Sequence, residues 1–151
     1  MAGTGGRACP TLIVHLVFST KERRKLILAE FQPRLWAYVA GICKKNEFFV
    51  HAVGGMDDHI HSLIQVPSTL ALAKAVLIIK SNSSRWAHER GQRVGWQEGY
   101  GAFSVSTSNL PVVERYVQNQ AVHHRKMSFE EEFTALLKRH GVEFDPRYVF
   151  G

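Results

Sequence analysis

Residues Phe48–Val66 read FFVHAVGGMDDHIHSLIQV and contain the clearest structural pattern in the sequence. Two short apolar runs, Phe48–Val53 and His59–Val66, flank a turn-forming segment of glycines and aspartates, which predicts a β-hairpin. Side chains alternate between the two faces of a strand, so His59 and His61 should share one face. The isoleucine between them should then enter the core.

The other expected elements surround this hairpin. Two further strands are predicted at Thr11–Phe18 and Tyr100–Ser106. Four helices are predicted: Phe31–Lys45, a second that ends at about His88, a third from Asn109 to about Val122, and Ser128–Arg139. Ser68 or Thr69 is the expected N-cap of the second helix. In the last helix Ser128 and Glu131 match a capping box, and Gly141 ends it. The order β-α-β-β-α-β predicts an α+β, ferredoxin-like antiparallel sheet with added C-terminal helices. One face of that sheet should lie under the first two helices, which leaves the other face for a site or a partner.

Length and composition favour a globular protein. The 151 residues suit a single domain, residues 1–151, with residues 1–10 as a loose tail, and 45% of residues are hydrophobic. Cys9 and Cys43 are too few for a disulfide framework and suit a reducing compartment. No apolar run approaches the ~20 residues of a membrane span, and the N-terminal tail lacks the apolar core of a signal peptide. We therefore expect a cytoplasmic protein that has no membrane partner.

The charge of the chain points to a polyanionic partner. The formal net charge is +6 and the isoelectric point is about 9.6. A small protein with clustered cations is a candidate polyanion binder, and nucleic acid is the commonest polyanion, although such clusters also serve solubility alone. The candidate DNA-binding residues are Lys21, Arg23, Arg24, Lys25, Lys80, Arg85, His123, Arg125 and Lys126.

Two further patterns suggest a catalytic centre. His59 and His61 on one strand face would supply half of a divalent metal site, or they are an ordinary surface pair on a half-exposed strand. On the third predicted helix, Tyr116 and Gln120 are four residues apart and therefore neighbours on the helix surface, and Asn119 and His123 flank them. This polar face suits a functional site, but a helix face that only contacts solvent would have the same sequence pattern.

Together these motifs resemble the HUH-type single-tyrosine transposases of small insertion sequences that move as single-stranded DNA, including relatives associated with repetitive extragenic palindromes. The resemblance is carried by four segments: HLVF at residues 15–18, GGMDDHIH at 54–61, WQEGYGAFSVS at 96–106 and YVQNQ followed by HHRKMSF at 116–129. It covers nearly the whole chain and implies a prokaryotic protein that is associated with the nucleoid. The fold of that family agrees with the β-α-β-β-α-β order expected from the residue patterns.

The resemblance implies a mechanism. Tyr116 would form a covalent 5′-phosphotyrosine ester, and His59, His61 and the carboxamide oxygen of Gln120 would hold Mg²⁺ or Mn²⁺ at the scissile phosphate. Imidazole ligands alone do not select one metal. The expected partners are single-stranded DNA, with hairpins at the element ends, and a second copy of the chain in a homodimer whose Tyr116 completes the site of its partner.

Other residues carry weaker expectations. Asp57 and Asp58 suit the hairpin turn, and Asp58 could also orient an imidazole. Trp36 and Trp86 are expected in the core, whereas Trp96 could stack on bases. Two rival functions use the same residues: a non-catalytic single-stranded nucleic-acid-binding protein, and a metal-dependent hydrolase that activates water and has no need of Tyr116.

Overall fold

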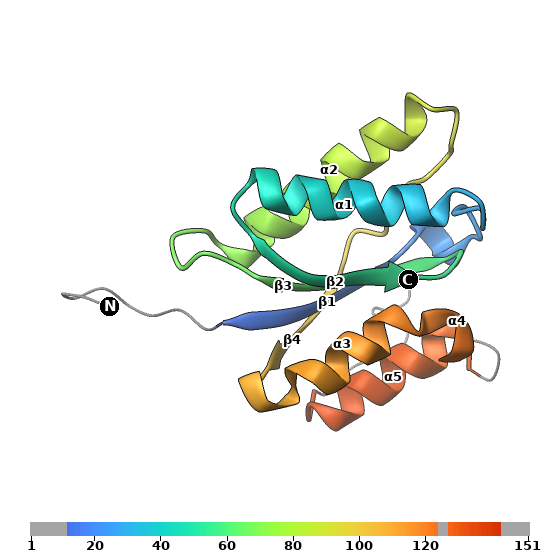
Figure 1. Cartoon of the computed structure of the whole chain (residues 1–151). Coiled ribbons are helices and arrows are strands. Elements are labelled where there is room, and N and C mark those ends of the chain that lie inside the picture. Colours follow the sequence, from blue (N-terminus) through green and yellow to red (C-terminus); the bar gives the residue numbers. More distant parts are fainter. Residues whose placement is uncertain (1–11, 124–126, 143–151) are drawn as a thin grey trace.

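The part of the chain that the structure describes is built on a four-stranded antiparallel sheet. The computed structural model describes residues 12–123 and 127–142 (Figure 1). The strands are β1 (Ile13–Ser19), β2 (Phe49–Gly55), β3 (His59–Gln65) and β4 (Gly101–Val105), in the spatial order β2-β3-β1-β4. The crossover between β1 and β2 places β3 between them, which confirms the ferredoxin-like α+β fold.

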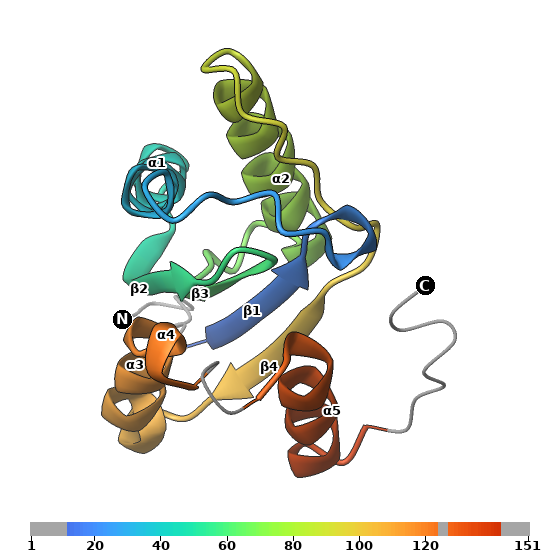
Figure 2. The same ribbon diagram turned by 90° about the vertical axis from the view of Figure 1, so that its right-hand side faces the viewer.

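Helices cover both faces of this sheet (Figures 1 and 2). On one face lie α1 (Gln32–Lys45) and α2 (Leu72–His88). On the opposite face lie α3 (Leu110–Gln118), α4 (Gln120–His123) and α5 (Phe129–Arg139). Short 3₁₀ turns, η1 (Lys21–Arg23) and η2 (Thr107–Asn109), follow β1 and β4. The C-terminal helices therefore cover the sheet face that was expected to remain available for a site or a partner.

Alternation along the central strands produces two separate apolar layers. Ile60 and Phe18 face α1 and α2 and belong to the larger cluster, whereas Val17 and Leu63 pack against α5 and α3 on the other side. Because both faces are covered, β1 is buried along its whole length. His59 and His61 are 0% exposed. The alternative that they form an ordinary surface pair is therefore wrong.

Three predicted element boundaries need correction. α2 begins at Leu72 with no side-chain cap, because Ser68 and Thr69 lie in a turn closed by a hydrogen bond from Leu70 N to Pro67 O. The helix predicted to run to Val122 is interrupted at Asn119 (φ −103°, ψ 31°), which separates α3 from α4. β2 extends to Gly55, which restricts the hairpin turn to residues 56–58.

The last helix has the ends that its sequence predicts. Ser128 Oγ accepts a hydrogen bond from Glu131 N, and the Glu131 carboxylate accepts one from Ser128 N, which completes the capping box. Gly141 follows the helix with a φ of +69°, a conformation that favours glycine. Within residues 12–123 and 127–142, no helix is both long and apolar enough to cross a membrane.

Candidate functional site

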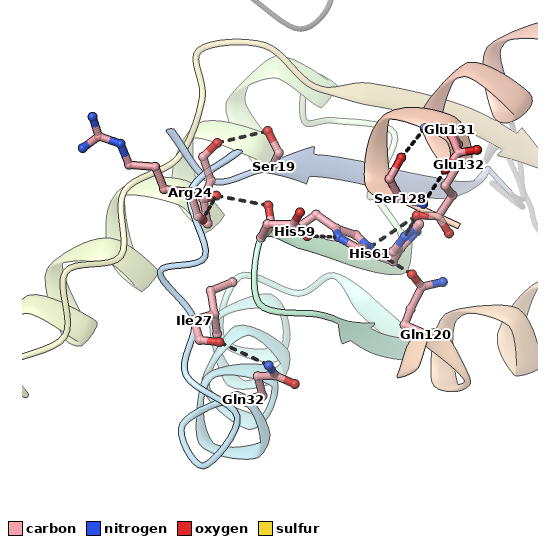
Figure 3. A network of polar contacts seen from close by, with 12 residues as sticks. Ser19, Arg24, Ile27, Gln32, His59, His61, Gln120, Ser128, Glu131 and Glu132 are labelled. Atoms are coloured by element: carbon pink, nitrogen blue, oxygen red, sulfur yellow. Dashed lines mark hydrogen bonds and ion pairs between the residues drawn. The ribbon is translucent and has the colours of Figure 1, made fainter. Parts of the chain in front are cut away.

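Two imidazoles of β3 form the floor of a buried site between the sheet and α5. His59 and His61 project from the same face of β3, with Ile60 between them directed into the opposite core, as predicted. Asp58 Oδ1 lies 2.7 Å from His59 Nδ1, so this carboxylate orients the ring and leaves Nε2 facing the site (Figure 3). Phe129 stacks on the His59 ring with centroids 4.6 Å apart and shields it from solvent.

Glu132 of α5 lies at the centre of the site. Its Oε1 lies 3.0 Å from His61 Nε2 and 3.3 Å from His59 Nε2, and the residue is 1% exposed. Its other carboxylate oxygen, Oε2, accepts a hydrogen bond from the hydroxyl of Tyr116. One buried carboxylate therefore contacts both histidines and the candidate nucleophile.

Tyr116 and Gln120 reach the site from α3 and α4. Gln120 Nε2 donates to the backbone carbonyl of Tyr116, 3.1 Å away, which turns Oε1 toward His59 Nε2 at 3.0 Å. Gln120 is 1% exposed. The spacing of four residues that suggested a shared polar face is thus realised across the break at Asn119.

The fixed position of α3 depends on a close approach of two backbones. A Cβ atom at Gly54 of β2 would lie 2.2 Å from the carbonyl oxygen of Val117. Only glycine permits this contact, which seats α3 directly on the sheet. Tyr116 precedes Val117 and is thereby held beside the histidines of its own chain.

A third histidine supports the pair from β1. His15 Nε2 lies 2.7 Å from His61 Nδ1, and the two rings are stacked with centroids 5.0 Å apart. His15 is 3% exposed and also touches the ring of Tyr116 edge-on. Burial, together with the neighbouring His61, lowers the pKa of His15 well below its usual value.

The site also shifts the pKa of two further groups. Burial alone would lower the pKa of His59, but hydrogen bonds to Asp58 and Glu132 outweigh it and raise the pKa to about 9. For Tyr116, burial and the adjacent Glu132 carboxylate raise the pKa above that of a free phenol. Without a cation the site therefore favours an imidazolium at His59 and a neutral phenol at Tyr116.

The donor atoms suit a divalent cation. Ligand atoms of His59, His61 and Glu132 all lie within 4.8 Å of one another. Adjacent ligands of an octahedral ion at about 2.1 Å lie about 3.0 Å apart, close to the 3.0–3.3 Å between the imidazole nitrogens and the oxygens of Glu132 and Gln120. Carboxylate and carboxamide oxygens beside neutral imidazoles suit Mg²⁺ and Mn²⁺ among other metals.

The structure brings together all four residues predicted for the catalytic centre: Tyr116, His59, His61 and Gln120. Sequence reasoning missed Glu132 and His15. A signal for Glu132 was present, because it interrupts the apolar stripe of α5 formed by Phe129, Phe133, Leu136 and Leu137. A carboxylate on the buried face of an amphipathic helix needs a hydrogen-bond or ion-pair partner, and a role in a functional site is one reason for such a residue.

The predicted DNA-binding residues fall into separate groups. Lys21, Arg23, Arg24 and Lys25 follow β1, whose Ser19 pairs with His59, so this loop begins next to the site. Arg23 Nε forms a 2.7 Å ion pair with Glu130 of α5. Arg24 pairs with Glu22 and points away from the two imidazoles (Figure 3).

The basic residues of α2 lie across the sheet from the histidines. Lys80 Nζ donates to the backbone carbonyls of Gln97, Glu98 and Gly99, and burial lowers the pKa of Lys80 to about 8. Arg85 is exposed and bonds to Asn82. Arg125 and Lys126 lie outside the described residues, and of His123 only the backbone, at the end of α4, is described.

The tryptophans have structural roles. Trp36 and Trp86 pack against the core under α1 and α2, as predicted. Trp96 Nε1 donates to Ser83 Oγ, and the rings of Trp96 and Phe18 form a T-shaped contact with centroids 4.9 Å apart. Trp96 is partly buried and packs against the same core.

Known structures share this fold. A chain from Deinococcus radiodurans R1, assigned as a transposase, superposes with a TM-score of 0.60 and 22% identity over 80% of this chain and 98% of that one. A REP-associated tyrosine transposase bound to a REP hairpin superposes with a TM-score of 0.59 and 16% identity over 82% of this chain and 74% of that one. At these identities the superpositions show a shared fold, which defines the chain as an α+β protein of this ferredoxin-like class.

Sequence comparison gives the family. Residues 8–120 match the family described as "Transposase IS200 like". The transposase for insertion sequence element IS200 of Salmonella typhimurium is 23% identical over 114 residues, 70% of this chain and 74% of the relative, and the Salmonella typhi transposase matches equally. The chain belongs to the IS200-like transposase family.

Proposed function

We propose that this protein cleaves and rejoins single-stranded DNA through a covalent bond between Tyr116 and a 5′-phosphate. The observation that carries the proposal is the contact of the Tyr116 hydroxyl with Glu132, whose other carboxylate oxygen faces His59 and His61. A nucleophile beside a candidate metal centre is what phosphoryl transfer requires. Membership of a transposase family supports this reading of the geometry.

In the proposed cleavage step, the phenolic oxygen of Tyr116 attacks the scissile phosphorus. The bond from that oxygen to phosphorus forms as the bond from phosphorus to the 3′ oxygen breaks, and the 3′ oxygen leaves and takes up a proton from water to become a hydroxyl. Glu132 Oε2 already accepts the phenolic hydrogen and is placed to take the proton. A divalent cation, Mg²⁺ or Mn²⁺, held by His59, His61, Gln120 and Glu132 would act as a Lewis acid on the non-bridging phosphate oxygens.

Rejoining reverses these bond changes. A phosphotyrosine ester retains the free energy of the phosphodiester, so a second 3′-hydroxyl can displace Tyr116 without ATP. The position of Tyr116 therefore favours strand transfer over hydrolysis. A metal-dependent hydrolase would use an activated water as its nucleophile and would leave the position of Tyr116 unexplained.

The proposed substrate is single-stranded DNA whose element ends carry hairpins. The net charge of +6 and the basic segment after β1 support a DNA partner, and a relative of the same fold has been solved with a REP hairpin. A transposase acting on chromosomal DNA would work in the bacterial cytoplasm.

We further propose that the active form is a homodimer. One Tyr116 holds one 5′ end, whereas moving a segment requires two, and two-fold dimers are the commonest oligomers. In the single chain the ring of Tyr116 lies 5.7 Å from that of His61, so Tyr116 could act either on its own subunit or on the partner. Mixing a His59→Ala, His61→Ala protein with a Tyr116→Phe protein tests exchange between subunits, because only exchange restores cleavage. An active protein that sediments as a monomer would refute the dimer.

The decisive experiment follows labelled single-stranded oligonucleotides on a denaturing gel. The wild-type protein should form a covalent adduct that needs Mg²⁺ or Mn²⁺, and Tyr116→Phe should lose it while retaining DNA binding. Tyr38→Phe, which alters a tyrosine of the helical layer on the other face, is the matched control and should retain the adduct. Cleavage by Tyr116→Phe would favour the hydrolase, and binding without cleavage by the wild type would favour the non-catalytic protein.

A further inference from the structure

His15 is a buried polar residue to which the proposed reaction assigns no role. It lies on β1, on the sheet face that carries His61, and is 3% exposed. Its Nε2 lies 2.7 Å from His61 Nδ1. A histidine in an apolar layer, between Ile13 and Val17 of the same strand face, needs a reason for its polarity.

The direction of this hydrogen bond is linked to the state of His61. The Nε2 atom of His61 faces the site, 3.0 Å from Glu132. To bind a cation, that nitrogen must present a lone pair, and a neutral imidazole then carries its proton on Nδ1. A donor on Nδ1 needs an acceptor, and His15 Nε2 occupies that place.

Burial makes His15 the available acceptor. His61 is 0% exposed, so bulk water does not reach its ring. The neighbouring ligand is arranged in the same way, because His59 Nδ1 meets Asp58 Oδ1 at 2.7 Å. Each imidazole of the pair thus has its own partner at Nδ1, a carboxylate for one and an imidazole for the other.

We infer that His15 is a positioning residue that fixes the ring and the tautomer of His61 for metal binding. The inference rests on the proposed metal site. Outer partners of metal-bound histidines typically change metal affinity by about 10- to 100-fold when they are removed. His15 can accept from His61 Nδ1 in the metal-bound state and donate to it in the metal-free state, because a neutral imidazole exchanges tautomers.

Three variants of the full chain separate this role from packing. His15→Leu keeps a similar volume and removes the acceptor, whereas His15→Gln restores an acceptor oxygen. His51→Leu is the control, because His51 is a histidine of the same sheet whose Nε2 is buried without a hydrogen-bond partner. Mn²⁺ binding is measured by electron paramagnetic resonance in the absence of DNA, and thermal unfolding of the metal-free variants checks that each one folds.

The expected result is a loss of Mn²⁺ affinity of about 10- to 100-fold in His15→Leu, and affinity within about threefold of wild type in His15→Gln and His51→Leu. In Mg²⁺-loaded wild-type protein, ¹⁵N spectra should place the His61 proton on Nδ1. Equal affinity in His15→Leu, or an equal loss in His15→Gln, would overturn the role of His15 and leave the metal site standing. A wild-type protein that binds no Mn²⁺ would overturn the metal site, and this inference with it.

Discussion

Tyr116 donates its phenolic hydrogen bond to Glu132, and the other oxygen of that carboxylate lies 3.0 Å from His61 Nε2. One side chain therefore joins the proposed nucleophile to a proposed metal ligand. Any change at Glu132 should act on both at once, which makes this residue the most sensitive probe of the site.

Glu132→Gln should lower both the Mn²⁺ affinity and the pKa of Tyr116 in the metal-free protein. Burial is the first cause of the raised pKa of Tyr116, and the Glu132 carboxylate is the second, so loss of its charge removes part of the shift. The Mn²⁺ affinity should fall at least about tenfold. Titration of tyrosinate absorbance, with Tyr116→Phe subtracted, measures the pKa.

Glu131→Gln serves as the matched control for this variant. Glu131 is the exposed neighbour in the capping box, and glutamine also suits that motif. It should leave both quantities unchanged. A Glu132→Gln protein with the wild-type Tyr116 pKa and the wild-type Mn²⁺ affinity would show that Glu132 only fills space.

Metal binding should strengthen as the pH rises. The pKa of His59 is raised to about 9, so a cation must displace a proton at neutral pH. The Mn²⁺ affinity should therefore rise about tenfold per pH unit up to that value and then level off. Binding isotherms between pH 6.5 and 9.5 measure this, and a flat profile over that range would show that His59 is already neutral.

Stability of the metal-free protein should show the opposite trend. A folded-state pKa of about 9 lies above the ordinary value of 6.5, so the protonated His59 stabilises the fold fully below about pH 6.5. That contribution is lost as the pH rises through 9. Asp58→Asn should reduce this dependence, since the hydrogen bond to Asp58 is a main cause of the raised pKa.

Most of the fold could be predicted from the sequence because the patterns that indicate its strands and helices are local. Alternation in the hairpin and helical spacing in the helices require only neighbouring residues, and both survive in the structure. The break at Asn119 was not visible, because residues on either side of it continue a helical pattern. Tertiary packing of α3 against β2 decides where that helix ends.

The site was only partly predictable for a related reason. His59 and His61 share a strand and Tyr116 and Gln120 share a turn, so each pair is visible as a spacing. Glu132 meets His61 across 71 positions and His15 meets it across 46, and only the docked helices and paired strands create those contacts.

The basic segment after β1 should contribute to DNA binding through phosphate contacts. A double variant, Lys21→Ala with Lys25→Ala, removes two exposed cations near the site. For single strands the slope of log affinity against log salt should become shallower by about 0.7 per lost contact, or about 1.4. Lys74→Ala, an exposed lysine at the start of α2, is the control and should keep the wild-type slope. An unchanged slope in the double variant would remove this segment from the interface.

The position of Tyr116 should depend on the glycine beneath α3. A Cβ at Gly54 would lie 2.2 Å from the Val117 carbonyl oxygen, so Gly54→Ala must push α3 off the sheet and should cost about 1–3 kcal/mol of unfolding free energy. The displaced helix carries Tyr116, and formation of the DNA adduct should fall more than the binding of DNA. Gly41→Ala is the control, because a Cβ there meets nothing within 4 Å and alanine should stabilise α1 by about 0.5–1 kcal/mol. Denaturant unfolding measures both variants. If Gly54→Ala were as stable and as active as wild type, α3 would not be held against β2 by this backbone contact.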